Sequence, residues 1–243
     1  MRSILNFNSS WNFYKATNDI NVKENAELVN LPHSWNAVDG QDGGNDYFRG
    51  SCVYTKSFAK NELPEGELHY LEINGANSSA TVFVNGEKKA THDGGYSTWR
   101  VDITEFLTEE TQIAIIVNNA PNDRVYPQFA DFTFYGGLYR DVNLICVNNT
   151  HFDLSYYGGK GLAISPIVKG EDAEVKGEVW VCNLNKGDKL VYTIYDKEEN
   201  EIAKVSQDAE EGCSFSADML IPSVHLWNGK KDPYLYCLEV EIV

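Results

Sequence analysis

Apolar and polar residues alternate with a period of two along most of the chain, which is the pattern of half-buried β-strands. One strand is predicted over Leu68–Ile73. Another is predicted over the apolar run Gln112–Val117, which is too short for a helix and rich in β-branched residues. Thr81–Val84 and Glu87–Ala90 flank the pair Asn85-Gly86. Because Asn-Gly supplies the two positive φ angles of a type I′ turn, these segments are predicted to form a β-hairpin.

Helical periodicity is scarce. The segment Asp102–Leu107 offers a helix start, with Asp102 at the cap and Glu105 three residues later in a capping-box pattern. Nothing periodic continues this segment, so one or two helical turns are expected there. Strand patterning with so little helix predicts an all-β protein.

The polar segment Asn148–Thr150 separates two patterns. Beyond it, short strands recur at the spacing of a β-sandwich, with turns at Asn185–Asp188 and Glu198–Asn200. Three sets of residues alternate there: Val175, Gly177, Val179 and Val181; Leu190, Tyr192 and Ile194; and Tyr234, Tyr236, Leu238, Val240 and Ile242. We therefore predict two domains, residues 1–148 and 149–243, the second an immunoglobulin-like β-sandwich.

The composition narrows the classes of partner. Hydrophobic residues make up 42% of the chain and aromatic residues 12%, which is enough to pack a core. The formal net charge of −16 repels phosphate backbones and anionic lipids, so we expect neither a nucleic acid nor a membrane partner. No apolar stretch is long enough for a signal peptide or a transmembrane helix. Five scattered cysteines without ligand spacing indicate reduced thiols, no zinc site and a cytoplasmic protein.

Three blocks in the first half resemble the sugar-binding domain of glycoside hydrolase family 2, and their order and spacing are similar to that family. The blocks are Leu31–Asn36 with Asp39–Gly50, then Val82–Gly86 with His92–Tyr96 and Asp102–Thr104, and finally Asp131–Val142. The motifs Leu226–Gly229 and Asp232–Tyr236 in the second half resemble the immunoglobulin-like domain of the same family. The Asp39–Gly50 block is most similar to the β-galactosidase branch.

The resemblance implies a jelly-roll domain, then an immunoglobulin-like sandwich, then a (β/α)₈ barrel with two catalytic glutamates. The sequence stops at Val243, inside an alternating strand, so the barrel is expected to be absent from this chain. The acid/base glutamate of the family follows an asparagine. Asn61-Glu62 and Asn200-Glu201 have that dipeptide, but both lie in predicted polar turns, so no catalytic residue is assigned.

Asp131 is the first candidate for a substrate contact. The resemblance implies that this aspartate reaches the sugar, where a carboxylate can accept hydrogen bonds from two adjacent hydroxyls. Asn45 and Asp46, on the glycine-rich Asp39–Gly50 loop, are further candidates. The alternatives stay open that Asp131 caps local backbone and that Asn45 and Asp46 satisfy a turn.

Other residues of these blocks are interpreted as structural. Asn119–Leu138 is a long connection rich in aromatic residues, most of which we assign to a domain interface. Arg140 is expected to pair with a buried carboxylate. His33 and His92 have no nucleophile motif beside them, so a structural role is expected for both.

The parent protein is therefore expected to hydrolyse terminal β-galactosides with retention of configuration, its two glutamates lying in the absent barrel. This chain would supply part of the sugar pocket and a surface for docking the barrel, and the full enzyme could be a homo-oligomer. No cofactor is expected for this chain, whereas a sodium or magnesium ion stays open for the full enzyme. A stand-alone carbohydrate-binding module and a scaffold for oligomer assembly are the alternatives.

Overall fold

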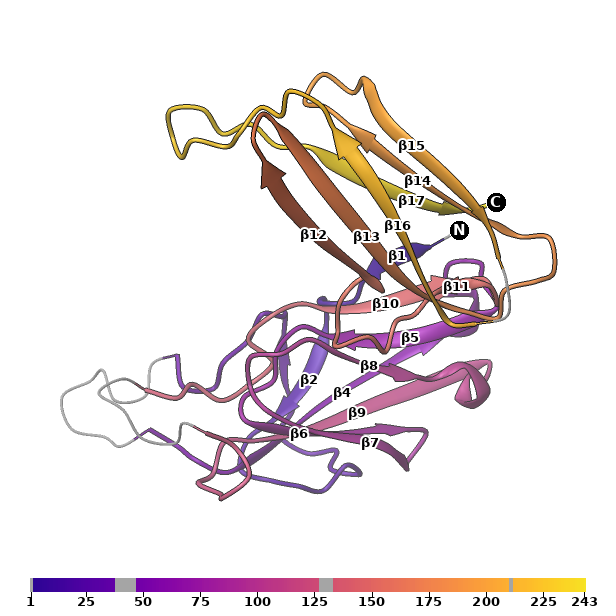
Figure 1. Cartoon of the computed structure of the whole chain (residues 1–243). Helices are drawn as coiled ribbons and strands as arrows, with labels where there is room; N and C mark the ends of the chain where they lie inside the picture. The colour runs from indigo at the N-terminus through magenta and orange to yellow at the C-terminus, as the bar shows by residue number, and fades with distance from the viewer. Residues whose placement is uncertain (1, 38–46, 127–132, 210–211) are drawn as a thin grey trace. The chain divides into compact units, whose positions relative to one another are not determined.

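The computed structural model describes residues 2–37, 47–126, 133–209 and 212–243 (Figure 1). Within these residues the fold is all-β, as predicted, and the helical turns are two short 3₁₀ segments, η1 (Lys60–Glu62) and η2 (Thr104–Phe106). The chain divides into two compact units, Met1–Asn148 and Asn149–Val243, called unit 1 and unit 2 below. In the described part of the chain, no helix is long and apolar enough to cross a bilayer.

Unit 1 contains two antiparallel sheets. The smaller sheet has the order β1 (Ser3–Asn6), β10 (Val142–Val147), β5 (Leu68–Ile73) and β8 (Trp99–Asp102). The larger sheet has the order β3 (Glu27–Val29), β2 (Trp11–Tyr14), β4 (Ser51–Ala59), β9 (Glu110–Asn118), β6 (Ser79–Val84) and β7 (Glu87–Asp93). Strands far apart in sequence are paired, as in a jelly-roll sandwich.

The core of unit 1 lies between the inner faces of these sheets. Trp11, Tyr54 and Leu71 are fully buried there, because alternate residues of each strand point inward. The edge of the core holds an ion pair between the guanidinium of Arg100 and the carboxylate of Glu72 at 2.7 Å, with both side chains at least nine-tenths buried. The expectation that Arg140 pairs with a buried carboxylate is wrong. Arg140 is exposed and donates to backbone carbonyls. The arginine that pairs with a buried carboxylate is Arg100.

Unit 2 is the immunoglobulin-like sandwich. One sheet contains β11 (His151–Phe152), β12 (Leu162–Lys169), β13 (Asp172–Cys182) and β16 (Ser214–Ile221), with β13 in the middle. The second sheet has the order β15 (Glu201–Asp208), β14 (Lys189–Tyr195) and β17 (Cys237–Ile242). The five cysteines, all within the described residues, are free thiols. A small core of buried aliphatic side chains around Tyr192 therefore holds the sandwich without a disulfide.

Most strand predictions are confirmed. β5 covers the predicted Leu68–Ile73, and the β6–β7 hairpin turns at Asn85 and Gly86 with φ of 50° and 83°. The predicted alternation from Tyr234 onward is only partly right, because β17 begins at Cys237. The reason is local: the Tyr234 ring stacks on His225 at a centroid distance of 4.0 Å, and the Tyr236 hydroxyl accepts the His225 backbone N–H. At Tyr234 and Tyr236, side-chain contacts with the loop at His225 thus take the place of the backbone hydrogen bonds of a β-ladder.

The predicted helix start at Asp102 is wrong in detail. The single turn of η2 begins at Thr104, its N-cap position is Ile103, and no side chain caps it. The Asp102 carboxylate accepts the Thr104 backbone N–H at 2.9 Å and the Thr104 hydroxyl, so it forms a local turn in place of a capping box.

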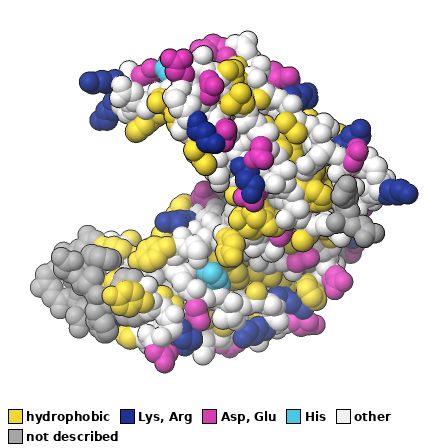
Figure 2. Space-filling view, in the orientation of Figure 1, with side chains coloured by type: hydrophobic (Ala, Val, Ile, Leu, Met, Phe, Trp, Pro, Cys, Tyr) yellow, Lys and Arg dark blue, Asp and Glu magenta, His cyan; other side chains and the backbone are white. Residues whose placement is uncertain are grey.

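Acidic side chains are spread over the surface of both units (Figure 2). Charge of this distribution favours solubility.

Candidate functional site

The three residues predicted to contact sugar, Asp131, Asn45 and Asp46, lie outside the described residues. The structure defines the segments that lead into and out of their loops. Four such segments lie at one end of unit 1: residues 33–37, 47–51, 118–126 and 133–138. How these segments are fixed decides what the loops can present, so they define the candidate site.

Two buried asparagines connect all four segments. Asn36 and Asn119 have 0% and 1% of their surface exposed. The Asn36 side-chain carbonyl accepts the backbone N–H of Gly136 at 2.7 Å and the Asn119 amide at 3.1 Å. The Asn36 amide in turn donates to the Phe48 carbonyl at 2.9 Å. The Asn119 side-chain carbonyl accepts the Gly50 N–H at 2.9 Å.

A neutral amide suits this place because it both donates and accepts. Buried backbone groups where strands end would otherwise lack partners, which is costly. We refer to Asn36, Asn119 and the backbone groups that they bind as the asparagine bridge. It joins the described segments that flank the two loops and fixes these segments on the β-scaffold.

Glycine is required beside the asparagine bridge. A Cβ on Gly136 would lie 2.1 Å from the Trp35 ring, and one on Gly137 would lie 2.3 Å from the His33 carbonyl oxygen. Gly137 also has φ of 131°, which side chains other than glycine rarely adopt. The close approach lets the Ser34 hydroxyl donate to the Gly136 carbonyl at 2.8 Å. Residues 33–36 and 136–138 are thereby packed as one layer.

Arg49 adds a cation to the same layer. Its guanidinium Nε donates to the Asn119 carbonyl at 2.9 Å, and its charge lies 5.8 Å from the centre of the Tyr47 ring. Phe48, between them, supplies the carbonyl that the Asn36 amide and the Trp35 indole N–H both use. The segment after the Asn45–Asp46 loop is therefore fixed at three successive residues.

Beneath this layer the half-buried His33 pairs with the buried Tyr54, with His33 Nδ1 2.8 Å from the Tyr54 hydroxyl. Burial lowers the pKa of His33 and raises the pKa of Tyr54 well above its ordinary value. The phenol therefore stays protonated beside a neutral imidazole. Burial also raises the pKa of the nearby Cys52 thiol to about 11, so this cysteine is a poor nucleophile.

Aromatic side chains of the Asn119–Leu138 connection divide between surface and core. Tyr126 is 92% exposed and Tyr135 is 40% exposed, whereas Phe134 is buried. Phe129 and Phe132 lie outside the described residues. The Tyr135 carbonyl accepts the Asn77 amide at 2.7 Å, which holds the backbone of this exposed ring.

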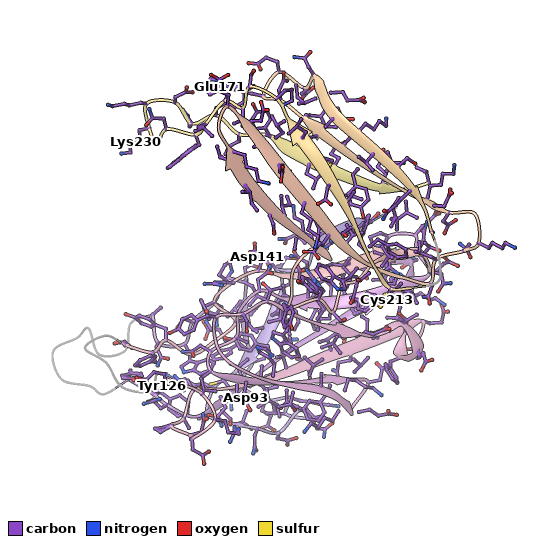
Figure 3. The ribbon with its side chains drawn as sticks, in the orientation of Figure 1. Asp93, Tyr126, Asp141, Glu171, Cys213 and Lys230 are labelled. Atoms are coloured by element: carbon purple, nitrogen blue, oxygen red, sulfur yellow. The ribbon has the colours of Figure 1, made fainter. Side chains whose placement is uncertain are left out.

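An ion pair fixes the same connection near its start. Arg124 Nε lies 3.0 Å from Asp93 Oδ2, and Figure 3 shows Asp93 and Tyr126 at the same end of unit 1. The Ser79 hydroxyl, followed by Arg124, lowers the pKa of Asp93. Both side chains are partly exposed, so the pair orients the loop more than it stabilises the fold.

The remaining polar candidates have structural contacts. His92 stacks on Trp99 at a centroid distance of 5.0 Å and lies 2.9 Å from the Ser97 hydroxyl. The Glu62 carboxylate accepts the Ala59 backbone N–H at 2.8 Å at the start of η1. Glu201 is exposed at the start of β15, 3.6 Å from Lys204.

Within the described residues, no group of three or more His, Cys, Asp or Glu side chains could hold a metal ion. A sodium or magnesium ion can also be held by carbonyl oxygens and a single carboxylate, so this absence does not test the ion considered for the full enzyme. The ion remains a prediction about the larger protein.

Asn36 and Asn119 were not singled out from the sequence, although signals for both exist. Asn36 closes the Leu31–Asn36 block, and Asn119 follows directly after the apolar β9. A polar amide where a buried strand ends marks a backbone that needs a partner. The identity of that partner, 83 positions away, is not encoded locally.

Comparison with known proteins agrees with this architecture. The family described as glycosyl hydrolase 2 galactose-binding domain-like matches residues 45–128. A β-glucuronidase from Bacteroides fragilis is 30% identical over 97% of this chain and 34% of its own length.

Two crystal structures are similar to the whole chain. An FMN-binding β-glucuronidase from Faecalibacterium prausnitzii L2-6 superposes with a TM-score of 0.89 and is 37% identical over 100% of this chain and 37% of that protein. A putative β-galactosidase from Bacteroides fragilis superposes with a TM-score of 0.90 and is 29% identical over 99% of this chain and 38% of that protein.

The chain thus spans about a third of the length of these relatives. The matched family covers two of the four segments joined by the asparagine bridge, residues 47–51 and 118–126, and the similar structures extend through unit 2. On this evidence the chain belongs to glycoside hydrolase family 2.

Proposed function

We propose that this chain forms the carbohydrate-contacting, non-catalytic part of a larger family 2 β-glycosidase. The asparagine bridge is the observation that carries the proposal. In it, the fully buried amides of Asn36 and Asn119 fix the bases of two loops. Loops held on a rigid β-scaffold commonly carry binding residues.

Asp131 is the proposed sugar contact of the longer loop. A carboxylate accepts hydrogen bonds from two neighbouring sugar hydroxyls, and such charge-assisted bonds are strong. It takes no part in proton transfer. Asn45 and Asp46 are proposed contacts from the other loop, and the exposed ring of Tyr126 offers an apolar face for a sugar or for a neighbouring domain.

The reaction is proposed for the whole protein. Two carboxyl groups outside this chain would act on the glycosidic bond, one protonating the leaving oxygen and one attacking the anomeric carbon, with net retention. Within the described residues, the two glutamates that follow asparagine have structural or surface positions. Hydrolysis is therefore not assigned to this chain.

The names of the relatives support two terminal sugars. The relatives of 37% and 30% identity are β-glucuronidases, which favours a β-glucuronide as the first substrate to test. A β-galactoside, predicted from the Asp39–Gly50 block, is the second candidate and is supported by the putative β-galactosidase of 29% identity.

The test is a parallel assay of the purified full-length protein with chromogenic β-glucuronide and β-galactoside, which share a leaving group. We expect turnover of at least one, with the preferred sugar having the larger kcat/KM. Turnover of neither, by a protein that is folded and binds a β-glycoside, would support the stand-alone carbohydrate-binding module. Failure to bind either sugar would favour the alternative that the chain is a scaffold for oligomer assembly.

A further inference from the structure

Three aromatic rings meet on the outer face of one sheet of unit 2. Trp180 lies in β13 between Val179 and Val181, which face the core, so its side chain lies on the outer face. The Tyr156 ring stacks on the Trp180 ring at a centroid distance of 3.7 Å and an interplanar angle of 15°. The rings of Tyr156 and Tyr157 meet edge to face, 5.0 Å apart at 74°. Tyr156 therefore lies between a ring that supports it and a ring nearly perpendicular to it.

The two tyrosines belong to a closed loop, residues 153–161. Both ends of the loop bind one residue of β13: the Trp180 carbonyl accepts the Asp153 backbone N–H at 2.8 Å, and the Trp180 N–H donates to the Gly161 carbonyl at 2.9 Å. A Cβ on Gly161 would lie 2.8 Å from the Asp153 carbonyl oxygen, so the ends approach this closely only with glycine. Inside the loop, the Asp153 carboxylate accepts the Ser155 N–H at 2.7 Å and the Ser155 hydroxyl at 2.6 Å. Compact loops with adjacent ends frequently carry function.

Tyr157 is held in a conformation and an environment that both cost free energy. Its φ is 44°, in the left-handed region where a Cβ is crowded by the backbone. The residue is also 91% exposed, so its ring gains almost nothing from burial. Glycine or asparagine at this position would adopt the same φ at a lower cost. A strained backbone that presents a large ring to solvent indicates a role for the ring outside the fold.

The surroundings of the rings favour a small ligand over a protein. Ser155, Lys160 and Ser214, the cross-strand partner of Trp180, are polar and exposed, so they bound the aromatic surface. A whole aromatic side chain buries roughly 150–250 Å², whereas a stable protein interface takes about 800 Å² from each partner. The net charge of −16 also disfavours a second copy of the chain and an anionic ligand. A tyrosine has an apolar ring face and a polar hydroxyl, which suit the C–H face and the hydroxyls of a neutral sugar.

We propose that Tyr156, Tyr157 and Trp180 form a sugar-binding site of unit 2 that takes a neutral pyranose of an oligosaccharide. The pyranose stacks on the exposed ring of Tyr157, which Tyr156 orients, and Trp180 holds Tyr156 in place. The tyrosine hydroxyls, with Ser155 and Lys160 of the same loop, supply donors and acceptors for the sugar hydroxyls. The site uses no residue of the unit 1 loops, so it and the proposed function can fail separately.

Fluorine NMR of the full-length protein tests the site directly. A 3-fluorotyrosine replaces Tyr157 in one sample and Tyr126 in another, because these residues are 91% and 92% exposed and lie in different units. Both samples are titrated with cellotetraose, xylotetraose and β-1,4-galactotetraose. We expect at least one sugar to change the Tyr157 resonance saturably, with half of the change at about 1 mM, since an open site encloses little of its ligand.

Two results would overturn the proposal. The first is no response at Tyr157 to any of the three sugars, and a response at Tyr126 alone would at the same time support the proposed function. The second is shielding of the Tyr157 fluorine from a soluble gadolinium chelate to the degree found for a fluorine at the buried Tyr192, because another part of the protein would then cover the ring.

A matched pair of variants at Tyr156 tests the stack, with the fluorine at Tyr157 as the reporter. Tyr156→Ala removes the ring that orients Tyr157 and is expected to weaken sugar binding at least about tenfold, whereas Tyr156→Phe keeps the stack on Trp180 and should stay within about twofold. Trp227→Ala is the control for losing an exposed aromatic ring, because Trp227 is 62% exposed in the loop before β17. Equal sugar affinity in Tyr156→Ala and Tyr156→Phe would contradict the proposed site.

Discussion

Unit 1 and unit 2 are both antiparallel sandwiches, yet they enclose their cores to different degrees. Unit 1 fully buries large side chains such as Trp11 and Tyr54. In unit 2 the core faces of the edge strands β12 and β17 remain half-buried or exposed. Two of the polar side chains that unit 1 buries, Asn36 and Asn119, form the asparagine bridge at the base of two loops. The two units therefore differ in where they depart from an apolar core: unit 1 buries amides at the base of two loops, whereas unit 2 leaves apolar side chains of its edge strands partly exposed.

The largest effect is expected from a side chain at Gly136. Gly136→Ala places a methyl group 2.1 Å from Trp35, so the indole or the loop backbone must move. We expect unit 1 to lose about 3 kcal/mol of unfolding free energy, measured by denaturant titration. The control in unit 2 is Gly187→Ala, where φ is 103° but no atom lies within 4 Å. A loss of about 1 kcal/mol, from backbone strain alone, is expected there.

Removing one amide of the asparagine bridge should have the next largest effect. Asn119→Ala removes a buried amide and leaves the half-buried Gly50 N–H without its acceptor, and we expect a loss of about 2 kcal/mol of unit 1 stability. The exposed Asn228→Ala of unit 2 is the comparison, with an expected loss of about 0.5 kcal/mol or less. Equal losses would show that the bridge contributes no more than a surface amide.

Unit 1 stability should fall in mild acid. Burial lowers the pKa of His33 and of His92, so both imidazoles are neutral in the folded state. The free energy of unfolding that these neutral imidazoles contribute is fully present above about pH 6.5, the unfolded-state pKa. It is lost as the pH falls from there through the lower folded-state pKa values. Thermal melts between pH 7.5 and 5 measure this slope. The double variant His33→Gln with His92→Gln should have a flatter profile, and an unchanged slope would contradict this assignment.

The smallest effect on stability is expected at Tyr126. Its side chain is 92% exposed, so Tyr126→Ala should change the unfolding free energy by about 0.5 kcal/mol or less. If the ring contacts sugar or a neighbouring domain, the same variant will weaken substrate binding or interdomain protection in the full-length protein while the melting of unit 1 stays constant. A large stability loss would instead place the ring in a structural contact.

Period-two patterning was sufficient to predict the strands, because strand burial depends on local alternation. Leu68–Ile73 and the Asn85-Gly86 turn were found on that basis. The asparagine bridge could not be found in this way, since Asn36 and Asn119 meet through the fold. The same limit explains the error at Arg140, because only the sheet order brings Arg100, and not Arg140, beside Glu72.

We propose above all that the loop after β9 delivers a sugar contact to a β-glycosidase. The most direct measurement compares kcat/KM of full-length Asp131→Ala and Asp123→Ala with the unmodified enzyme. Asp123 is a matched control, because it is an exposed aspartate of the same connection. We expect Asp131→Ala to lower kcat/KM at least about tenfold, about 1.4 kcal/mol of lost transition-state binding, with an unchanged melting temperature, and Asp123→Ala to stay within about twofold. Equal kinetics for the two variants, or unfolding by Asp131→Ala, would contradict the assignment.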